Sequence, residues 1–202
     1  MQMELGQTYH IYNHANGTEN IFPEEENYRF FLQQYEKYLV DVVDTYAYCL
    51  MPNHFHLLVG VKGDSDLAGF QNLPGLSSTN LGHSSRNPAI KAFSDFFNSY
   101  TKAFNKRFER RGSLFVKHFK RTPILDEKQW QEAFLYIHLN PIKHGFVKEI
   151  QDWKWSSWHA YQQPEKPSNL NRNYYLNFFD GPSHIQEMME TKKEWLSNKE
   201  YE

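Results

Sequence analysis

His54 and His56 stand at alternate positions of this 202-residue chain and could together bind a metal ion. Side chains alternate across a β-strand, so residues i and i+2 lie on one face while Phe55 points to the other. Two neutral imidazoles on one face can bind the same divalent cation. Because the chain has ten histidines, the pair alone is a weak sign of a metal site and also fits two core histidines.

A second pair of chemically useful residues, Tyr136 and Asn140, is spaced i and i+4 and therefore shares one face of a predicted helix. An Asn140 amide oxygen as third ligand would place the Tyr136 hydroxyl one helical turn from the ion. A tyrosine is a poor nucleophile at neutral pH unless its target is activated, and a bound cation can activate a phosphodiester. The resulting phosphotyrosine would conserve the bond energy, which suits strand transfer. Alternatively, Tyr136 is a half-buried aromatic and Asn140 a polar residue at a helix end.

The type of ion follows from these ligands. Mg²⁺ prefers shells made of oxygen alone, whereas two imidazoles favour Mn²⁺ or a site that accepts either ion. We therefore expect a divalent metal ion, Mg²⁺ or Mn²⁺, as the cofactor.

The composition predicts a soluble, cytoplasmic globular protein. Hydrophobic residues make up 40% and aromatic residues 17% of the chain, which is enough for a substantial core. No apolar run approaches the ~20 residues of a membrane-spanning helix, and the first residues do not resemble a signal peptide. The single cysteine, Cys49, excludes an intrachain disulfide and a cysteine-based zinc site.

Positive charge is concentrated in one stretch, although the whole chain has a formal net charge of −2. Eight basic residues stand there against Glu109: Lys102, Lys106, Arg107, Arg110, Arg111, Lys117, Lys120 and Arg121. Such a stretch can bind an anionic polymer, or it can be a solvated helix face followed by a charged loop.

The elements that must position these residues follow from periodicity and turn signals. The sequence predicts strands at Thr8–His14, Asp41–Met51, Phe55–Lys62 and Ser113–Ile124. It predicts helices from Pro23 to Leu39, at Ala89–Arg107, at Glu127–Asn140 (ended by Pro141 and Gly145) and at Ser183–Ser197, with a surface loop at Asp64–Pro88. The first six elements run strand, helix, strand, strand, helix, strand. This order is typical of an α+β, ferredoxin-like split βαβ unit, an antiparallel sheet with helices on one face, here followed by a C-terminal extension.

Four segments resemble a known family: YCLMPNHFHLLV (48–59), FNKRFERRGSLFVKHFKR (104–121), YIHLNPIKHGFV (136–147) and DWKWSSWHAY (152–161). They are similar, in the same order, to the HUH-type single-tyrosine transposases, in particular the REP-associated tyrosine transposases. The resemblance implies a catalytic domain at residues 1–161 and leaves residues 162–202 as a C-terminal extension, predicted to be helical.

The resemblance also implies an activity: cleavage and rejoining of single-stranded, hairpin-associated DNA through a 5′-phosphotyrosine. His54 and His56 match the paired metal ligands and Tyr136 matches the nucleophile, while Asn140 stands where relatives have a polar ligand, often glutamine. The residues expected to bind DNA are Lys102, Arg107, Arg110, Arg111, Lys117, Lys120, Arg121, Lys143 and His144. Relatives include monomers and dimers, so a homodimer is one expected state.

Two other functions stay open at this point. One is a domesticated relative that binds hairpin DNA or RNA without turnover. The other is a metallohydrolase that uses His54 and His56 with a bound water, for which no carboxylate or general base stands at a matching position.

Overall fold

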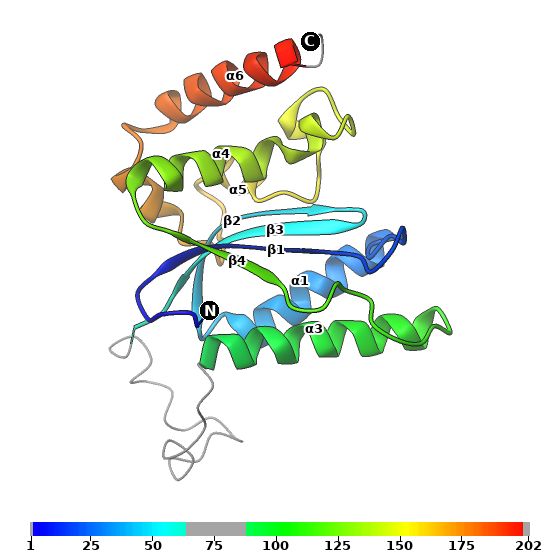
Figure 1. Ribbon diagram of the computed structural model, residues 1–202. Helices are drawn as coiled ribbons and strands as arrows, with labels where there is room; N and C mark the ends of the chain where they lie inside the picture. The colour runs from blue at the N-terminus through cyan, green and yellow to red at the C-terminus, as the bar shows by residue number, and fades with distance from the viewer. Residues whose placement is uncertain (1, 64–87, 200–202) are drawn as a thin grey trace.

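The computed structural model describes residues 2–63 and 88–199, and its centre is one four-stranded antiparallel sheet (Figure 1). The strands are β1 (Thr8–His14), β2 (Val43–Met51), β3 (His54–Val61) and β4 (Lys120–Ile124), in the order β2-β3-β1-β4. The helices are α1 (Glu25–Leu39), α3 (Pro88–Arg107), α4 (Glu127–Lys143), α5 (Trp158–Gln162) and α6 (Pro182–Lys199), with short 3-10 helices η3 (Ile150–Asp152) and η4 (Arg172–Asn177). The predicted α+β fold with an antiparallel sheet is confirmed. None of the described helices is long and apolar enough to cross a bilayer.

The helices α1 and α3 cover one face of the sheet together, as the split βαβ order predicts (Figure 1). Their aromatic stripes meet the inward-facing residues of β1 and β3. Phe31 of α1 lies 4.8 Å from Phe96 of α3 and 5.3 Å from Phe55 of β3, measured between ring centroids. Phe55 is fully buried, so alternation along β3 turns its histidine neighbours to the other face.

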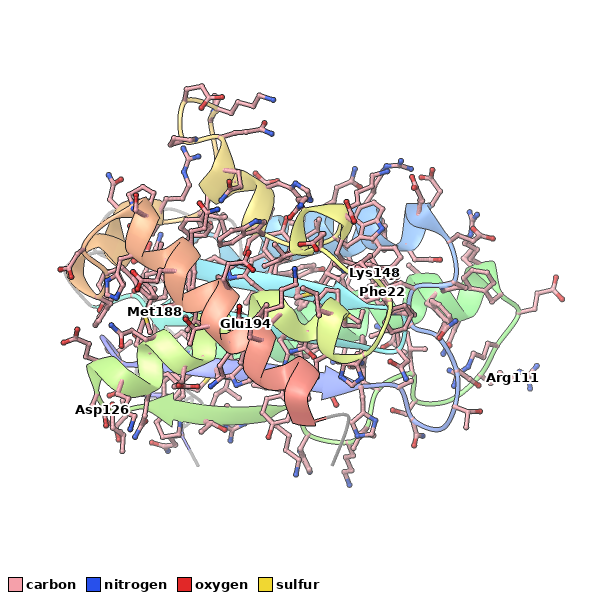
Figure 2. All side chains as sticks on the ribbon, turned by 90° about the horizontal axis from the view of Figure 1, so that it is seen from above. Phe22, Arg111, Asp126, Lys148, Met188 and Glu194 are labelled. Atoms are coloured by element: carbon pink, nitrogen blue, oxygen red, sulfur yellow. The ribbon has the colours of Figure 1, made fainter. Side chains whose placement is uncertain are left out.

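The prediction placed helices on one face of the sheet only. The structure has helices on the other face as well, where α4 packs on the sheet and α6 packs on α4 (Figure 1). Trp130, Phe134 and Ile137 of α4 are buried there in one hydrophobic cluster that also contains residues of β2 and β3. Ile185 and Met189 of α6 belong to the same cluster, and Figure 2 shows α6 lying over α4. The predicted C-terminal helix is therefore present, and it shares its core with α4. The division at residue 161 stays a prediction.

The structure differs from the predicted elements at two described places. The fourth strand begins only at Lys120, because His118 has a left-handed φ of 65° that interrupts extended backbone. The third helix was predicted to end at Asn140, before Pro141 and Gly145, but it continues through Pro141 to Lys143 and stops before Gly145. The segment predicted as a loop, 64–88, lies outside the described residues except for its last position.

The end of α4 explains why Pro141 does not stop the helix. Gly145, with φ 68°, donates its N–H to the Ile142 carbonyl (2.9 Å), and Phe146 donates to the Pro141 carbonyl (2.9 Å). These two bonds form a Schellman motif, which satisfies the last carbonyl groups of the helix. The glycine therefore ends the helix, and the catalytic candidates before it remain in regular helical geometry.

A buried hydroxyl ties α4 to the outer edge of β2. Ser157 Oγ accepts the Tyr48 backbone N–H (2.8 Å) and lies 2.7 Å from His138 Nε2. Because His138 Nδ1 lies 3.0 Å from the Phe134 carbonyl, which can only accept, Nδ1 carries the proton and Nε2 accepts from Ser157. The Ser157 hydroxyl, just before α5, therefore links strand β2 to helix α4.

We predict that Ser157→Ala lowers the free energy of unfolding by about 2 to 4 kcal/mol, because it leaves a buried N–H and a buried imidazole nitrogen without partners. Urea denaturation would measure the change. Ser94→Ala, which removes an exposed hydroxyl bonded only within its own helix, should change stability by less than about 0.5 kcal/mol. A loss below about 1 kcal/mol for Ser157→Ala would show that the network is not essential.

Candidate active site

The register of β1 against β3 brings two sets of polar side chains onto the face under α4. Tyr12 lies opposite His56, and His14 lies opposite His54. Side chains alternate along both strands, so His10 shares this face with Tyr12 and His14. A polar patch therefore spans the two central strands at the end of the sheet where the β2–β3 turn lies.

The helix α4 completes the patch with both of its predicted functional residues. The Tyr136 ring centroid lies 5.3 Å from that of His56 and 5.9 Å from that of His10. Asn140 is fully buried, and its Nδ2 donates to the Tyr136 carbonyl of the preceding turn (3.0 Å). The structure thus brings together the two histidines, the tyrosine and the asparagine that the sequence singled out, while their chemical roles stay predictions.

Hydrogen bonds orient both imidazoles. His54 Nδ1 lies 2.7 Å from the Asn53 amide oxygen, which can only accept, so this Nδ1 carries the proton and Nε2 keeps its lone pair. His56 Nδ1 lies 3.0 Å from His10 Nε2. When His56 donates in that bond, its Nε2 is also free to bind a cation, with His10 as the outer partner that metal-binding histidines usually have.

Burial keeps these rings neutral. It lowers the pKa of His54 to about 4, with a further contribution from the charge of His144, and it lowers the pKa of His10 to about 4. Burial also holds the pKa of His56 well below its usual range, with His10 and His54 adding to the effect. Neutral imidazoles at pH 7 are the form that binds a metal ion.

One buried atom in the patch lacks a partner among the described residues: the Asn140 amide oxygen, Oδ1. An unpaired buried carbonyl oxygen costs roughly 1 to 3 kcal/mol, and a hard cation would satisfy it. The described residues contain no group of three or more His, Cys, Asp or Glu side chains that could hold a metal. A site made of two imidazoles and one amide oxygen nevertheless fits a divalent ion with open positions for substrate or water.

His10, Tyr12 and His14 belong to the patch although they are not among the residues predicted from the sequence. The available signal was the alternation in TYHIYNH, which places all three on one face of β1, away from buried Ile11. Their nearness to His54 and His56 could not be predicted, since it depends on the register between strands about forty residues apart.

Lys143 and His144 extend the patch at the C-terminal end of α4. Lys143 Nζ lies 4.7 Å from the centroid of the Tyr136 ring, and the His144 ring lies 5.1 Å from that of His54. Both side chains are exposed. The position of an ammonium group above the tyrosine ring suits an anionic substrate at this end of the patch.

The structure separates the other predicted DNA-binding residues into two groups. Arg107 forms an ion pair with Glu24, and Arg110 forms one with Glu19 (2.6 Å) and is mostly buried. Lys102, Arg111, Lys117 and Lys120 are exposed, as is Arg107 despite its ion pair. Arg121 is partly buried with its guanidinium 5.3 Å from the Phe119 ring centroid. Arg111 and Asp126 lie at opposite ends of the molecule, and α4 runs from Asp126 toward the end that carries Arg111 (Figure 2).

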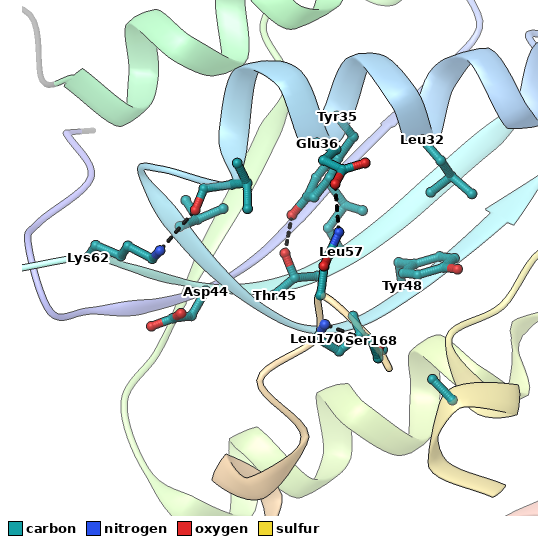
Figure 3. A pocket seen from close by; sticks show the side chains of 14 residues that line it. Leu32, Tyr35, Glu36, Asp44, Thr45, Tyr48, Leu57, Lys62, Ser168 and Leu170 are labelled. Atoms are coloured by element: carbon teal, nitrogen blue, oxygen red, sulfur yellow. Dashed lines mark hydrogen bonds between the residues drawn. The ribbon is translucent and has the colours of Figure 1, made fainter. Parts of the chain in front are cut away.

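A cavity of about 250 Å³ between α1 and the edge of β2 is distinct from this patch (Figure 3). Its polar side chains already bond to one another: Tyr35 Oη lies 2.7 Å from Thr45 Oγ1, and Asn169 donates to Glu36 (2.7 Å). With Glu36 and Asp44 in its wall, the cavity is poorly suited to an anionic polymer.

We predict that Asn140→Leu keeps or raises the free energy of unfolding, by up to about 1 kcal/mol, because it replaces an unsatisfied buried carbonyl with an apolar group of similar shape. The matched control is Asn13→Leu. Asn13 is also buried, but its Nδ2 donates to the Val116 carbonyl and its Oδ1 accepts the His14 N–H. The control should lose about 1 to 3 kcal/mol in urea denaturation. Equal losses for the two variants would contradict an unpaired Asn140 oxygen.

Several known proteins are similar to this chain in sequence or in fold. No protein-family model matches the chain. It is 28% identical over 119 residues to a Haemophilus influenzae protein assigned as a REP-associated tyrosine transposase, covering 57% of this chain and 59% of that protein. It is 32% identical over 68 residues to a REP-associated tyrosine transposase of Escherichia coli K12, covering 32% of this chain and 41% of that protein.

The chain thus spans 59% and 41% of the lengths of these two curated relatives. A solved REP-associated tyrosine transposase bound to a REP hairpin has the same fold, with a TM-score of 0.60, 18% identity and coverage of 84% of this chain and 87% of that one. At that identity the structural likeness shows the fold alone. The predicted resemblance is confirmed: the chain is similar to REP-associated tyrosine transposases.

Proposed function

We propose that this protein is a DNA strand-transferase that binds single-stranded, hairpin-associated DNA and cleaves and rejoins it with Tyr136 as the nucleophile. The observation that carries the proposal is the position of Tyr136: its ring centroid lies 5.3 Å from that of the buried His56 and 4.7 Å from Lys143 Nζ. The curated relatives are named as tyrosine transposases, and the solved structure with this fold holds a REP hairpin, which supports the same reaction and partner.

In the proposed reaction the Tyr136 oxygen attacks a phosphorus atom of the strand. The Tyr136 O–P bond forms, the bond from phosphorus to the 3′ oxygen breaks, the phenol proton goes to water and the 3′ oxygen takes up a proton. Lys143 pairs with the phosphate throughout, which offsets negative charge in the transition state. Attack by a 3′ hydroxyl on the phosphotyrosine reverses these steps, so a strand can be rejoined without another energy source.

We infer that His54, His56 and Asn140 hold a divalent cation, Mg²⁺ or Mn²⁺. The neutral imidazoles and the unpaired Asn140 oxygen support this assignment. When bound, the ion would polarise the non-bridging phosphate oxygens and make the phosphorus more electrophilic. His10 is a positioning residue in this scheme, because it reaches the cation only through His56.

Tyr136→Phe tests the nucleophile. The variant should form no covalent protein–DNA adduct on single-stranded hairpin oligonucleotides in Mn²⁺ or Mg²⁺, while its affinity for the same DNA stays within about threefold, since only one hydroxyl is removed from the surface. Denaturing gels measure the adduct and fluorescence anisotropy measures binding. Tyr12→Phe is the matched control, because the Tyr12 ring also lies near His56 (5.7 Å), and it should keep the adduct.

An adduct that persists in Tyr136→Phe would refute the role of Tyr136. Wild-type protein that binds hairpins tightly but forms no adduct with either ion would instead indicate the domesticated binding module.

The metal assignment predicts an effect on stability that needs no DNA. Mn²⁺ at a hundredfold excess over its Kd should stabilise the wild type by about 2.7 kcal/mol, and a variant with both His54→Ala and His56→Ala should lose this increment. His10→Ala should weaken Mn²⁺ binding about 10- to 100-fold, because it removes the outer partner of His56. His184→Ala, on α6, should leave Mn²⁺ binding unchanged. A wild-type unfolding curve that does not respond to Mn²⁺ or Mg²⁺ would refute the assignment.

A further inference from the structure

A second cavity, of about 560 Å³, lies between α3 and the segment that leads into β4. It is on the opposite side of β1 from the candidate active site, since Asn13 lines it while Tyr12 and His14 face α4. Its volume falls within the range of sites that enclose a small molecule or one nucleotide. The proposed function makes no use of this cavity.

Its α3 wall presents polar groups that are free to bind a ligand. Asn98 and Thr101 are one turn apart, and neither side chain forms a hydrogen bond with a described residue. Other polar residues of the same helix do have such partners: Ser99 donates to Gln34 (2.9 Å) and Asn105 donates to the Gly112 carbonyl (2.9 Å). An amide offers a donor and an acceptor side by side, which is the pattern that matches the edge of a nucleobase.

The rest of the wall is aromatic. Phe97 and Phe115 are buried with their ring centroids 5.3 Å apart, and Phe119 lies 5.4 Å from Phe97. Phe119 is the partly exposed ring of the three, so a base can stack on Phe119 while its edge meets the Asn98 amide.

The mouth of the cavity carries positive charge. Lys117 is exposed there, Arg121 lies beside Phe119, and none of the described residues that line the cavity is acidic. Phosphate groups on either side of a base would meet these cations. The charge therefore favours a nucleotide within a strand over an uncharged aromatic ligand.

The cavity wall is bonded directly to the strand that carries the active-site face. The Val116 N–H donates to the His14 carbonyl (3.0 Å), and Asn13 Nδ2 donates to the Val116 carbonyl (3.1 Å). The cavity wall and the active-site face therefore share the end of β1.

We propose that this cavity binds one unpaired nucleotide of the DNA strand that is cleaved at Tyr136, with its base against Asn98 and Thr101 and its phosphates near Lys117 and Arg121. The inference rests on the proposed function and adds a site of base recognition to it.

Abasic scanning would test this site. The probe is a hairpin oligonucleotide whose stem and single-stranded flanks are selected for binding from a randomised pool, used with Tyr136→Phe protein to prevent cleavage. Each flank nucleotide is replaced in turn by an abasic residue, and Kd is measured by anisotropy. One position should lose about tenfold or more in affinity, as expected for a base that stacks on protein.

The double variant Asn98→Ala, Thr101→Val should bind the intact strand about tenfold more weakly and show no further loss at that position. Gln186→Ala, which removes an exposed amide from α6, should keep the wild-type profile. An abasic penalty that persists undiminished in the double variant, or an equal penalty at every position, would overturn the cavity proposal while leaving the adduct on Tyr136 untouched. Failure to select any bound strand would overturn both proposals.

Discussion

The packing of α4 on β2 and β3 is the contact on which the rest of the site depends. Trp130, Phe134 and Ile137 form one buried stripe of the helix, and they meet a sheet face with small residues such as Ala47 and Cys49. Each large side chain contributes roughly 2 to 3 kcal/mol by burial, so the orientation of α4 about its own axis is strongly determined. Tyr136 and Asn140 lie about a quarter turn from this stripe, which directs them toward the histidines of β1 and β3.

The polar patch under α4 is costly because it is buried. Neutral His10 and His56 occupy space that apolar side chains fill elsewhere on the same face, and the Asn140 oxygen lacks a partner among the described residues. The structure tolerates this cost because the apolar contacts of α4 and the Ser157 network fix the surrounding elements. Binding and catalytic sites commonly contain buried polar groups that lower stability locally, and the surrounding rigid structure holds those groups in position.

The two sides of β1 serve different parts of the same proposed substrate. One side carries His10, which bonds to the proposed metal ligand His56, and the other contributes Asn13 to the cavity that we assign to an unpaired base. The segment before β4 joins them through the Val116–His14 backbone bond. Arg110 holds this segment to Glu19, and its contact with DNA stays a prediction.

The sequence by itself determined the element order, the alternation of His54 and His56 around buried Phe55, and the shared helical face of Tyr136 and Asn140. These features depend on local periodicity, which nearby residues encode. The tertiary structure was needed to show that His10 bonds to His56, that Arg110 is paired with Glu19, and that no described residue bonds to the Asn140 oxygen. The structure also shows that α4 continues through Pro141 and stops before Gly145, the second predicted stop, because Gly145 and Phe146 supply the bonds that complete its last turn. Such partners depend on strand register, helix docking and end geometry, which no local pattern specifies.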